Sequence, residues 1–343
     1  MEALLRKLVD APSISGSEES VREVMTKELK PHVDDIKVDR VGNLITRKGS
    51  GSPKIMLAAH MDEIGLMVKY ITKDGFIKFD TVGGWDDRIM LGSKVKVHGS
   101  KGPLVGVIGT KPIHLQDREE SRNIVKKKDM FIDTGAADNK EMEKYGISAG
   151  DFITHYGQVD RMLGTRLTGY GLDNRIGCLV MIEAVKALKN FKGSIYAVGT
   201  VQEEIGLIGV RGSAFGINPD AMLALDVCIA GDTPSVGPEE TNVALGKGPC
   251  LVLKDASSIV NPRVRKWVTE TAKKNKIKLQ YEVTSGGATD AAVMPVIREG
   301  IASGALSTPL RHIHTPVEVA DMKDIHSTIA LVVKLVESAG AYF

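Results

Sequence analysis

Apolar residues recur at helical spacing at the start of the chain. Three leucines form one face of a predicted first helix: Leu4, Leu5 and Leu8. After a turn over residues 12–17, four more apolar residues predict a second helix that stops at Pro31: Val21, Val24, Met25 and Leu29. Ser15 and Glu18 have the spacing of a capping box at the start of this second helix. A hairpin turning at residues 42–43 and a buried strand at residues 55–59 are predicted to follow.

Between about residues 65 and 164 the pattern changes to short β-like runs separated by Gly-rich turns. The runs lie at residues 66–71, 76–79, 93–97 and 104–108, with no long amphipathic helix between them. This pattern predicts a small barrel or sandwich. Residues 110–128 within it are polar and charged, which predicts a long mobile loop.

Strands and helices alternate again from Leu167 onward. Apolar residues predict a helix near 176–188, a helix over 262–274 opened by Asn261, and a last helix beginning near Asp321. Apolar runs predict strands at residues 194–201, 221–225, 278–283 and 301–306. Such alternation predicts an α/β fold with a largely parallel or mixed sheet flanked by helices. The simplest organisation joins residues 1–64 and 165–343 into one α/β domain, with residues 65–164 inserted as a β-rich domain.

Composition and charge are those of an ordinary globular protein, with 43% hydrophobic and 26% charged residues. Lys and Arg number 45 against 43 Asp and Glu, a net charge of +2 that argues against a nucleic-acid or membrane-surface binder. No apolar run approaches the roughly 18 residues needed to span a bilayer, and the N-terminus lacks the pattern of a signal peptide. The three cysteines form no zinc or disulfide motif. We therefore expect a cytoplasmic protein without nucleic-acid or membrane partners.

Residues that bind metals follow several of the predicted strands. The carboxyl ends of strands in an open α/β sheet meet at one edge, so these side chains are expected on the same rim. They are His60 and Asp62 after strand 55–59, Asp173 before the helix near 176, Glu203 and Glu204 after strand 194–201, Asp226 after strand 221–225, and His314 after strand 301–306.

Histidine and carboxylate together suit a pair of divalent transition metals. Such a pair needs one bridging carboxylate and about two further ligands for each ion, and a carboxylate outside the ligand set can act as general base. Each residue taken alone has an ordinary explanation, as a core histidine, a turn residue or a helix cap. Their presence on one rim is harder to explain by packing. Residues 86–88, Asp-Asp-Arg, lie in the β-rich region and are interpreted as a solvated turn.

Six motifs resemble those of the tetrahedral, or TET, aminopeptidases, a family of dinuclear-metal peptidases. Some of its members carry the label glutamyl aminopeptidase or endoglucanase. The motifs occur in the family's order and extend over nearly the whole chain: AHMDEIG at 59–65, LDNR at 172–175, TVQEEIG at 200–206, ALDV at 224–227, GGATDAA at 286–292 and HIHTPVE at 312–318.

The resemblance implies a role for each candidate residue. His60 and Asp226 would bind one metal, Glu204 and His314 would bind the other, and Asp173 would bridge them. Glu203 would be the general base, and Asp62 would orient His60. The cofactors would be two divalent ions per subunit, zinc or cobalt. The resemblance also implies a zinc-peptidase-like catalytic domain, a PDZ-like dimerisation domain, dimers that assemble into a homododecamer, and short peptides as substrates.

Two positions depart from the family pattern. Asn174 stands where Asp is common, although the bridging Asp173 is retained. In related enzymes the peptide bond after this Asp is often cis, which we predict for Asp173–Asn174 as well. His312 stands where an aromatic residue is common, and on an extended segment its side chain would face away from that of His314.

The function expected from these residues is a metal-dependent aminopeptidase that acts through a water activated by two metals and a Glu base. The alternative is a dinuclear-metal deacylase of N-acyl amino acids. A glycosidase that uses Glu203 and Glu204 would leave both histidines unexplained, and adjacent residues do not suit the spacing that such enzymes need. A binding protein with a decayed site is not favoured, because every ligand and the base are present.

Overall fold

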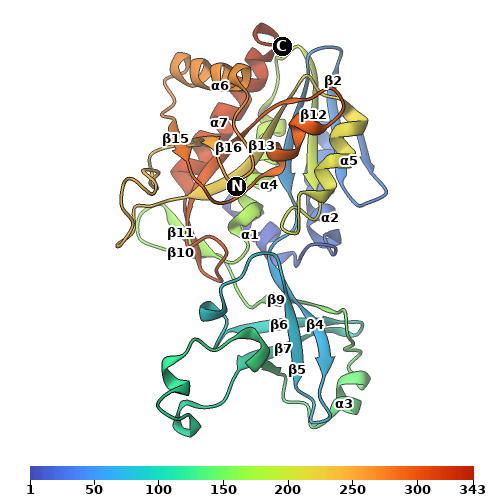
Figure 1. Ribbon diagram of the computed structural model, residues 1–343. Coiled ribbons are helices and arrows are strands. Elements are labelled where there is room, and N and C mark those ends of the chain that lie inside the picture. Colours follow the sequence, from blue (N-terminus) through green and yellow to red (C-terminus); the bar gives the residue numbers. More distant parts are fainter.

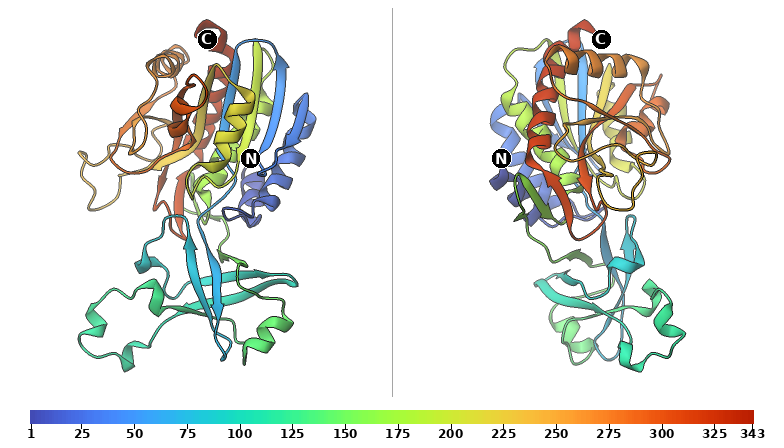
Figure 2. Two further views of the ribbon diagram at one scale, coloured as in Figure 1. Left: turned by 45° about the vertical axis from the view of Figure 1, so that its right-hand side comes forward. Right: turned by 90° about the vertical axis from the view of Figure 1, so that its left-hand side faces the viewer.

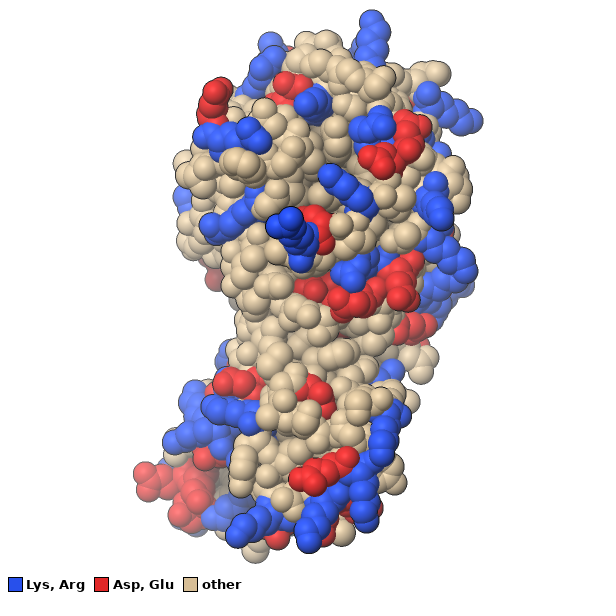
Figure 3. All heavy atoms as spheres, turned by 90° about the vertical axis from the view of Figure 1, so that its right-hand side faces the viewer, with Lys and Arg blue, Asp and Glu red and all other residues tan.

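The computed structural model describes all residues, 1–343. The chain forms a large lobe that contains both termini and a smaller β-rich lobe below it (Figure 1). On the face shown in Figure 3, a narrower waist joins the two lobes, and acidic and basic side chains are interspersed. No helix is both long enough and apolar enough to cross a membrane.

The chain forms seven α-helices and seventeen strands. The helices are α1 (Glu2–Asp10), α2 (Glu19–Leu29), α3 (Asn139–Lys144), α4 (Leu172–Ala187), α5 (Ile208–Ile217), α6 (Pro262–Lys274) and α7 (Met322–Ser338). The strands are β1 (Asp35–Val38), β2 (Leu44–Ser50), β3 (Lys54–His60), β4 (Gly65–Ile71), β5 (Ile77–Val82), β6 (Lys94–Gly99), β7 (Gly102–Gly109), β8 (Phe131–Asp133), β9 (Phe152–His155), β10 (Asp160–Arg161), β11 (Arg166–Gly169), β12 (Gly193–Thr200), β13 (Ala221–Ile229), β14 (Cys250–Lys254), β15 (Gln280–Val283), β16 (Ala302–Arg311) and β17 (Glu318–Asp321).

The large lobe is built on one mixed sheet of eleven strands. Their order is β1-β2-β12-β3-β13-β16-β17-β11-β10, with β14 and β15 attached beside β16. The central strands β12, β3, β13 and β16 are parallel to one another, the other pairs in this order are antiparallel, and β14 and β15 form a parallel pair. The predicted mixed sheet flanked by helices is therefore confirmed (Figure 2).

Both faces of this sheet are buried, which explains why its central strands are almost wholly apolar. In β3, Ile55, Leu57 and Ala59 join the core on the side of α1, α2, α4 and α7. Met56 and Ala58 alternate with them and pack on the opposite side, in the cluster that includes α5. The strand is thus held on both faces up to its last residue, His60.

The smaller lobe is a closed six-stranded barrel with strand order β4-β5-β8-β7-β6-β9. Its core of 13 buried apolar residues is separate from the cores of the large lobe. The chain enters through β4 directly after β3 and leaves through β9, and β10 then pairs with β11 in the large sheet. Residues 110–128, predicted as a long loop, contain short 3₁₀ turns at Ile113–Leu115 and Glu120–Arg122.

Several predicted elements are confirmed and some local predictions are wrong. Asn261 and Asp321 cap α6 and α7 as the sequence indicates. The predicted capping box is wrong, because α2 begins after Glu18 and the Ser15 hydroxyl donates to Asp62 instead. Strand β13 extends four residues past its predicted end, to Ile229. The elements that were not predicted are helices α3 and α5 and strands β8, β9, β10, β11, β14 and β17.

Candidate metal centre and active site

The structure brings together all seven residues that the sequence marked as candidates. His60 Nε2 lies 3.2 Å from Asp173 Oδ1 and 3.6 Å from Asp226 Oδ1. On the other side of Asp173, His314 Nε2 lies 3.5 Å from Asp173 Oδ2 and 3.5 Å from Glu204 Oε2. Asp173 therefore presents one carboxylate oxygen to each histidine. Asp226 lies within β13 rather than at its end, but it still faces the same site.

The first turn of α4 positions Asp173. The Asp173–Asn174 peptide bond is cis, as predicted. The Asn174 amide donates to the carbonyl of Leu225, 2.9 Å away, and its oxygen accepts from the backbone N–H of Gly177 at 2.8 Å. An ionised Asp could not donate to that carbonyl. The Asn that departs from the family pattern thus links the start of α4 to β13, one residue before Asp226.

Glu318 connects the two halves of the site and was not singled out from the sequence. Its side chain is buried and accepts from the backbone N–H of Asp173 and from that of His314, each at 3.1 Å. Burial raises the pKa of Glu318 well above its ordinary value, and the Asp173 charge adds to this. Its only sequence signal was its place at the end of the HIHTPVE motif.

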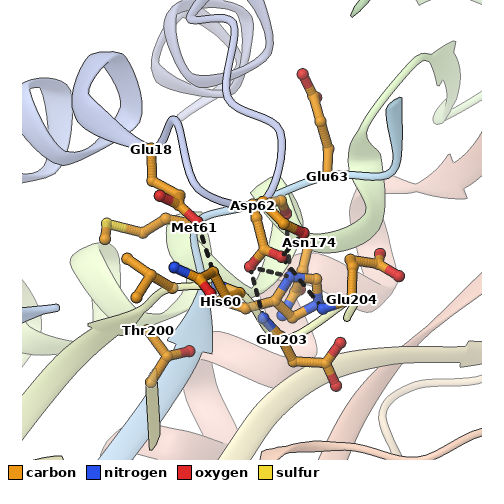
Figure 4. Close-up of polar contacts among 12 residues, drawn as sticks. Glu18, His60, Met61, Asp62, Glu63, Asn174, Thr200, Glu203 and Glu204 are labelled. Atoms are coloured by element: carbon orange, nitrogen blue, oxygen red, sulfur yellow. Dashed lines mark hydrogen bonds and ion pairs between the residues drawn. The ribbon is translucent and has the colours of Figure 1, made fainter. Parts of the chain in front are cut away.

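Asp62 holds the segment that carries Glu203 and Glu204 (Figure 4). Its Oδ1 accepts from the Glu203 N–H at 3.1 Å, and its Oδ2 accepts from the Glu204 N–H at 3.1 Å and from the Ser15 hydroxyl at 2.6 Å. His60 Nδ1 lies 3.0 Å from the backbone carbonyl oxygen of Asp62 and 3.6 Å from the carboxylate Oδ1 of the same residue. Asp62 therefore contacts three of the other candidate residues at once.

Replacing Ser15 by Ala should lower the free energy of unfolding by about 1.5 kcal/mol, because it removes a hydrogen bond to a buried carboxylate. It should also lower kcat, because Asp62 is then less firmly held. Urea unfolding and steady-state kinetics measure the two effects. Ser17→Ala, two residues away and without a side-chain hydrogen bond, is the matched control. Equal stability and activity in both variants would contradict this role for Ser15.

The carboxylates of the site are crowded and poorly solvated. Burial raises the pKa of Glu204 to about 8, helped by the neighbouring Asp173 charge, and burial raises the pKa of Glu203 well above its ordinary value. Burial opposes the charged form of His314, but Asp173 and Glu204 outweigh it and raise the His314 pKa to about 9. No Lys or Arg forms an ion pair with these residues. The carboxylates of the site therefore lack a Lys or Arg counter-charge, which a bound cation would supply.

The residues present fit divalent transition metals. Two sets place one ligand atom per residue within 4.8 Å of one another: His60, Asp173 and Glu204, and His60, Glu203 and Asp226. Asp173 Oδ1 is buried and has no hydrogen-bond partner, since its 3.2 Å approach to His60 lacks hydrogen-bond geometry. Two ligands bonded at about 2.0–2.1 Å to one tetrahedral ion lie roughly 3.3 Å apart. The spacing of Asp173 and His60 matches that value.

The site opens into a pocket of about 900 Å³. His312 and His314 both line it, and both lie in the left-handed backbone region, at φ 58° and 60°. The segment is therefore not extended, and the expectation for an extended segment, that the two side chains face opposite ways, does not apply. From the barrel side, the carbonyl oxygen of Gly84 lies 3.0 Å from His314 Nδ1. A Cβ at Gly84 would sit 3.2 Å from the same nitrogen, so only glycine leaves the ring undisturbed.

Residues 42–331 match the sequence profile of the M42 glutamyl aminopeptidase family. The chain belongs to this family. It is 41% identical over 334 residues to a putative aminopeptidase of Acetivibrio thermocellus, with 97% of each chain covered. It is 37% identical over 342 residues to the lysyl aminopeptidase of Pyrococcus furiosus, covering 97% of this chain and 96% of that one.

Solved structures of TET peptidases share the same fold. The TET1 peptidase of Pyrococcus horikoshii, which can assemble into a tetrahedron or a large octahedral shell, matches at a TM-score of 0.90. It is 36% identical, with 98% of both chains covered. The resemblance to the TET aminopeptidases is thus confirmed, and the chain is an M42 aminopeptidase that acts on peptides.

Proposed function

We propose that this M42 aminopeptidase removes N-terminal residues from short peptides by means of two bound divalent ions, zinc or cobalt. The observation that carries the proposal is the position of Asp173 between His60 and His314, with one carboxylate oxygen toward each. Asp173 would bridge the two ions. His60 and Asp226 would complete one site, and Glu204 and His314 would complete the other.

When bound, such a pair polarises the peptide carbonyl and lowers the pKa of water to near neutrality. Of the two carboxylates that this ligand set does not need, Asp62 is already held by Ser15 and two backbone N–H groups, which leaves Glu203. It is nine-tenths buried and close to His60 and Asp226. Because burial raises its pKa, its carboxylate accepts a proton from water readily and can pass it to the leaving amine. Asp62 is a positioning residue, since it binds the Glu203 N–H.

Aminoacyl-p-nitroanilides test the reaction class. The metal-loaded protein should hydrolyse substrates with a free amine and should not hydrolyse their N-acetylated counterparts. The alternative, a deacylase of N-acyl amino acids, finds no support among the relatives, which are aminopeptidases. Release of amino acids from N-acetyl-amino acids, with no action on free-amine substrates, would overturn the proposal in favour of that alternative.

Removing the metals should abolish the activity and lower the stability. A ligand present at 1,000 times its dissociation constant stabilises a protein by about 4.1 kcal/mol, so chelation should lower the melting temperature measurably. Dialysis against a chelator, followed by addition of cobalt or zinc, tests both effects with calorimetry and p-nitroanilide hydrolysis. Magnesium is the control, because this nitrogen-containing ligand set suits it poorly. Full activity in protein shown to be metal-free would contradict the proposal.

The barrel is the part of the chain best placed to join subunits. We assign residues 65–164 to a PDZ-like dimerisation domain inserted into a catalytic domain of residues 1–64 and 165–343, and we expect dimers that build a homododecamer. Large apolar side chains are exposed on this lobe, among them Val105 on β7 and Ile113 and Leu115 in the loop after it. Analytical ultracentrifugation tests the assembly, and a monomer at working concentrations would refute it.

A further inference from the structure

A carboxylate without a cation partner lines the pocket into which the candidate metal site opens. Glu282 lies on β15 and is 6% exposed, and its Oε1 is buried without a hydrogen-bond partner. The backbone N–H of Ile229 is near the carboxylate and favours its charged form. No Lys or Arg stabilises it, whereas buried carboxylates are ordinarily paired. Glu282 Oε1 can therefore still accept a hydrogen bond from a bound ligand.

The neighbours of Glu282 do not supply the missing charge. Lys254, on the adjacent strand β14, donates its ammonium group to the carbonyls of Asp255 and Thr284. Asp255 is itself acidic, and its oxygens accept from the backbone and side chain of Ser258 and from the Ser257 N–H. Burial raises the pKa of Glu282 to about 7, and the Asp255 charge adds to this. This region of the pocket is therefore acidic, and both of its carboxylates are buried.

The path from the metal site to Glu282 is lined by apolar side chains. Strand β13 continues from Asp226 to Ile229, and three residues of strand span roughly 10 Å. Cys228 of β13 and Val252 of β14 pack in the same core cluster, line the pocket and are buried. A long aliphatic side chain that starts at the metals would pass this wall and bring its end to Glu282.

We propose that Glu282 is a specificity-determining residue, and that the enzyme prefers peptides whose first residue is Lys or Arg. The inference rests on the proposed aminopeptidase function, because the substrate amine must lie at the metal site. The methylene groups of Lys or Arg pack against the apolar wall, as such stems do on protein surfaces. The cationic head then forms a charge-assisted hydrogen bond with the buried carboxylate.

Arg211 lines the same pocket and would favour an acidic first residue. Its side chain is exposed, however, and its guanidinium already donates to the carbonyls of Leu207 and Gly206. A charge at the solvated mouth contributes less than one at an enclosed end, because water screens it. The geometry therefore favours a basic first residue over an acidic one.

The test compares kcat/KM for Lys-, Arg-, Leu- and Glu-p-nitroanilides at one metal concentration. The wild-type enzyme should prefer the Lys and Arg substrates. Glu282→Gln should lower kcat/KM for these two by roughly 10- to 100-fold, mainly through KM, and leave the Leu substrate within about twofold. Glu282→Asp, which keeps the charge, should retain part of the preference. Arg211→Gln is the control and should not weaken hydrolysis of the Lys substrate.

An equal loss on Lys and Leu substrates in Glu282→Gln would overturn the proposal, because it would indicate a structural role. So would a wild-type preference for the Glu substrate that Arg211→Gln removes. If the Glu282 variants do not fold, inhibition of the wild-type enzyme by free lysine and free leucine decides, and equal inhibition refutes the proposal. A metal-loaded enzyme that hydrolyses none of the four substrates would instead refute the proposed function.

Discussion

Replacing Glu203 by Gln should lower kcat by at least about 100-fold, the lower range for loss of a general base. Glutamine keeps the size of the side chain but cannot accept the proton of the attacking water. The backbone N–H that donates to Asp62 is unchanged, so the segment should keep its position. Steady-state kinetics on a p-nitroanilide, with metal content determined by mass spectrometry on the same sample, measures the effect.

Glu204→Gln is the matched comparison, because it changes the neighbouring residue in the same way. Its carboxylate lies 3.5 Å from His314 and is assigned as a ligand, so this variant should lose metal as well as activity. Glu203→Gln should keep two ions per subunit and still fail to turn over. A Glu203→Gln enzyme with both ions and full kcat would refute the assignment of the base, whatever the result for Glu204.

The fold could be predicted wherever burial imposes a regular spacing of apolar residues along the sequence. Strand β3 and helix α7 are long and strongly patterned, and each lies close to its predicted position. Helix α5 was missed because three of its ten residues are glycine, which has a low helix propensity. Its stability comes instead from tertiary contacts, with Val210 and Ala214 buried against the sheet. The spacing of apolar residues within α5 alone does not indicate these contacts with the sheet.

The candidate site could be predicted because most of its residues lie at or near the carboxyl ends of parallel strands, which meet at one edge of the sheet. The residues that hold those ligands could not be predicted in the same way. Ser15 has the local spacing of a helix cap, yet its hydroxyl binds the carboxylate of Asp62, 47 positions away. Glu318 belongs to a short strand and binds Asp173 across 145 positions. Such partners are set by the fold, and nothing in the local sequence distinguishes them from ordinary polar residues.

Arg175→Met should lower the free energy of unfolding by about 3–5 kcal/mol, the usual cost of removing one partner of a buried ion pair. Arg175 is completely buried, and its guanidinium lies 3.0 Å from Glu63 Oε2. It also donates to three backbone carbonyls, those of Leu8, Met61 and Ala11. Methionine fills much of the same volume but satisfies none of these groups, and it leaves Glu63 buried without its cation.

Urea unfolding at a fixed protein concentration measures this cost, with Arg161→Met as the control. Arg161 also pairs with a glutamate, Glu2, but its side chain is 76% exposed, so its loss should cost far less stability than the loss of Arg175. Adding Glu63→Gln to Arg175→Met should recover part of the lost stability, because it removes the unpaired charge. Similar losses in the two single Arg variants would contradict the buried-pair explanation.

The pH dependence of the Arg175→Met cost gives a second check. Burial raises the pKa of Glu63 from 4.5 to about 7 even with Arg175 beside it, and without that cation the folded-state pKa should rise further. A carboxyl whose pKa is raised on folding binds more protons in the folded protein than in the unfolded one. Its contribution to the free energy of unfolding is therefore complete below the unfolded pKa of 4.5, and it is lost as the pH rises through the folded pKa. The variant should therefore lose more stability above pH 7 than near pH 5, and the Glu63→Gln double variant should not show this difference.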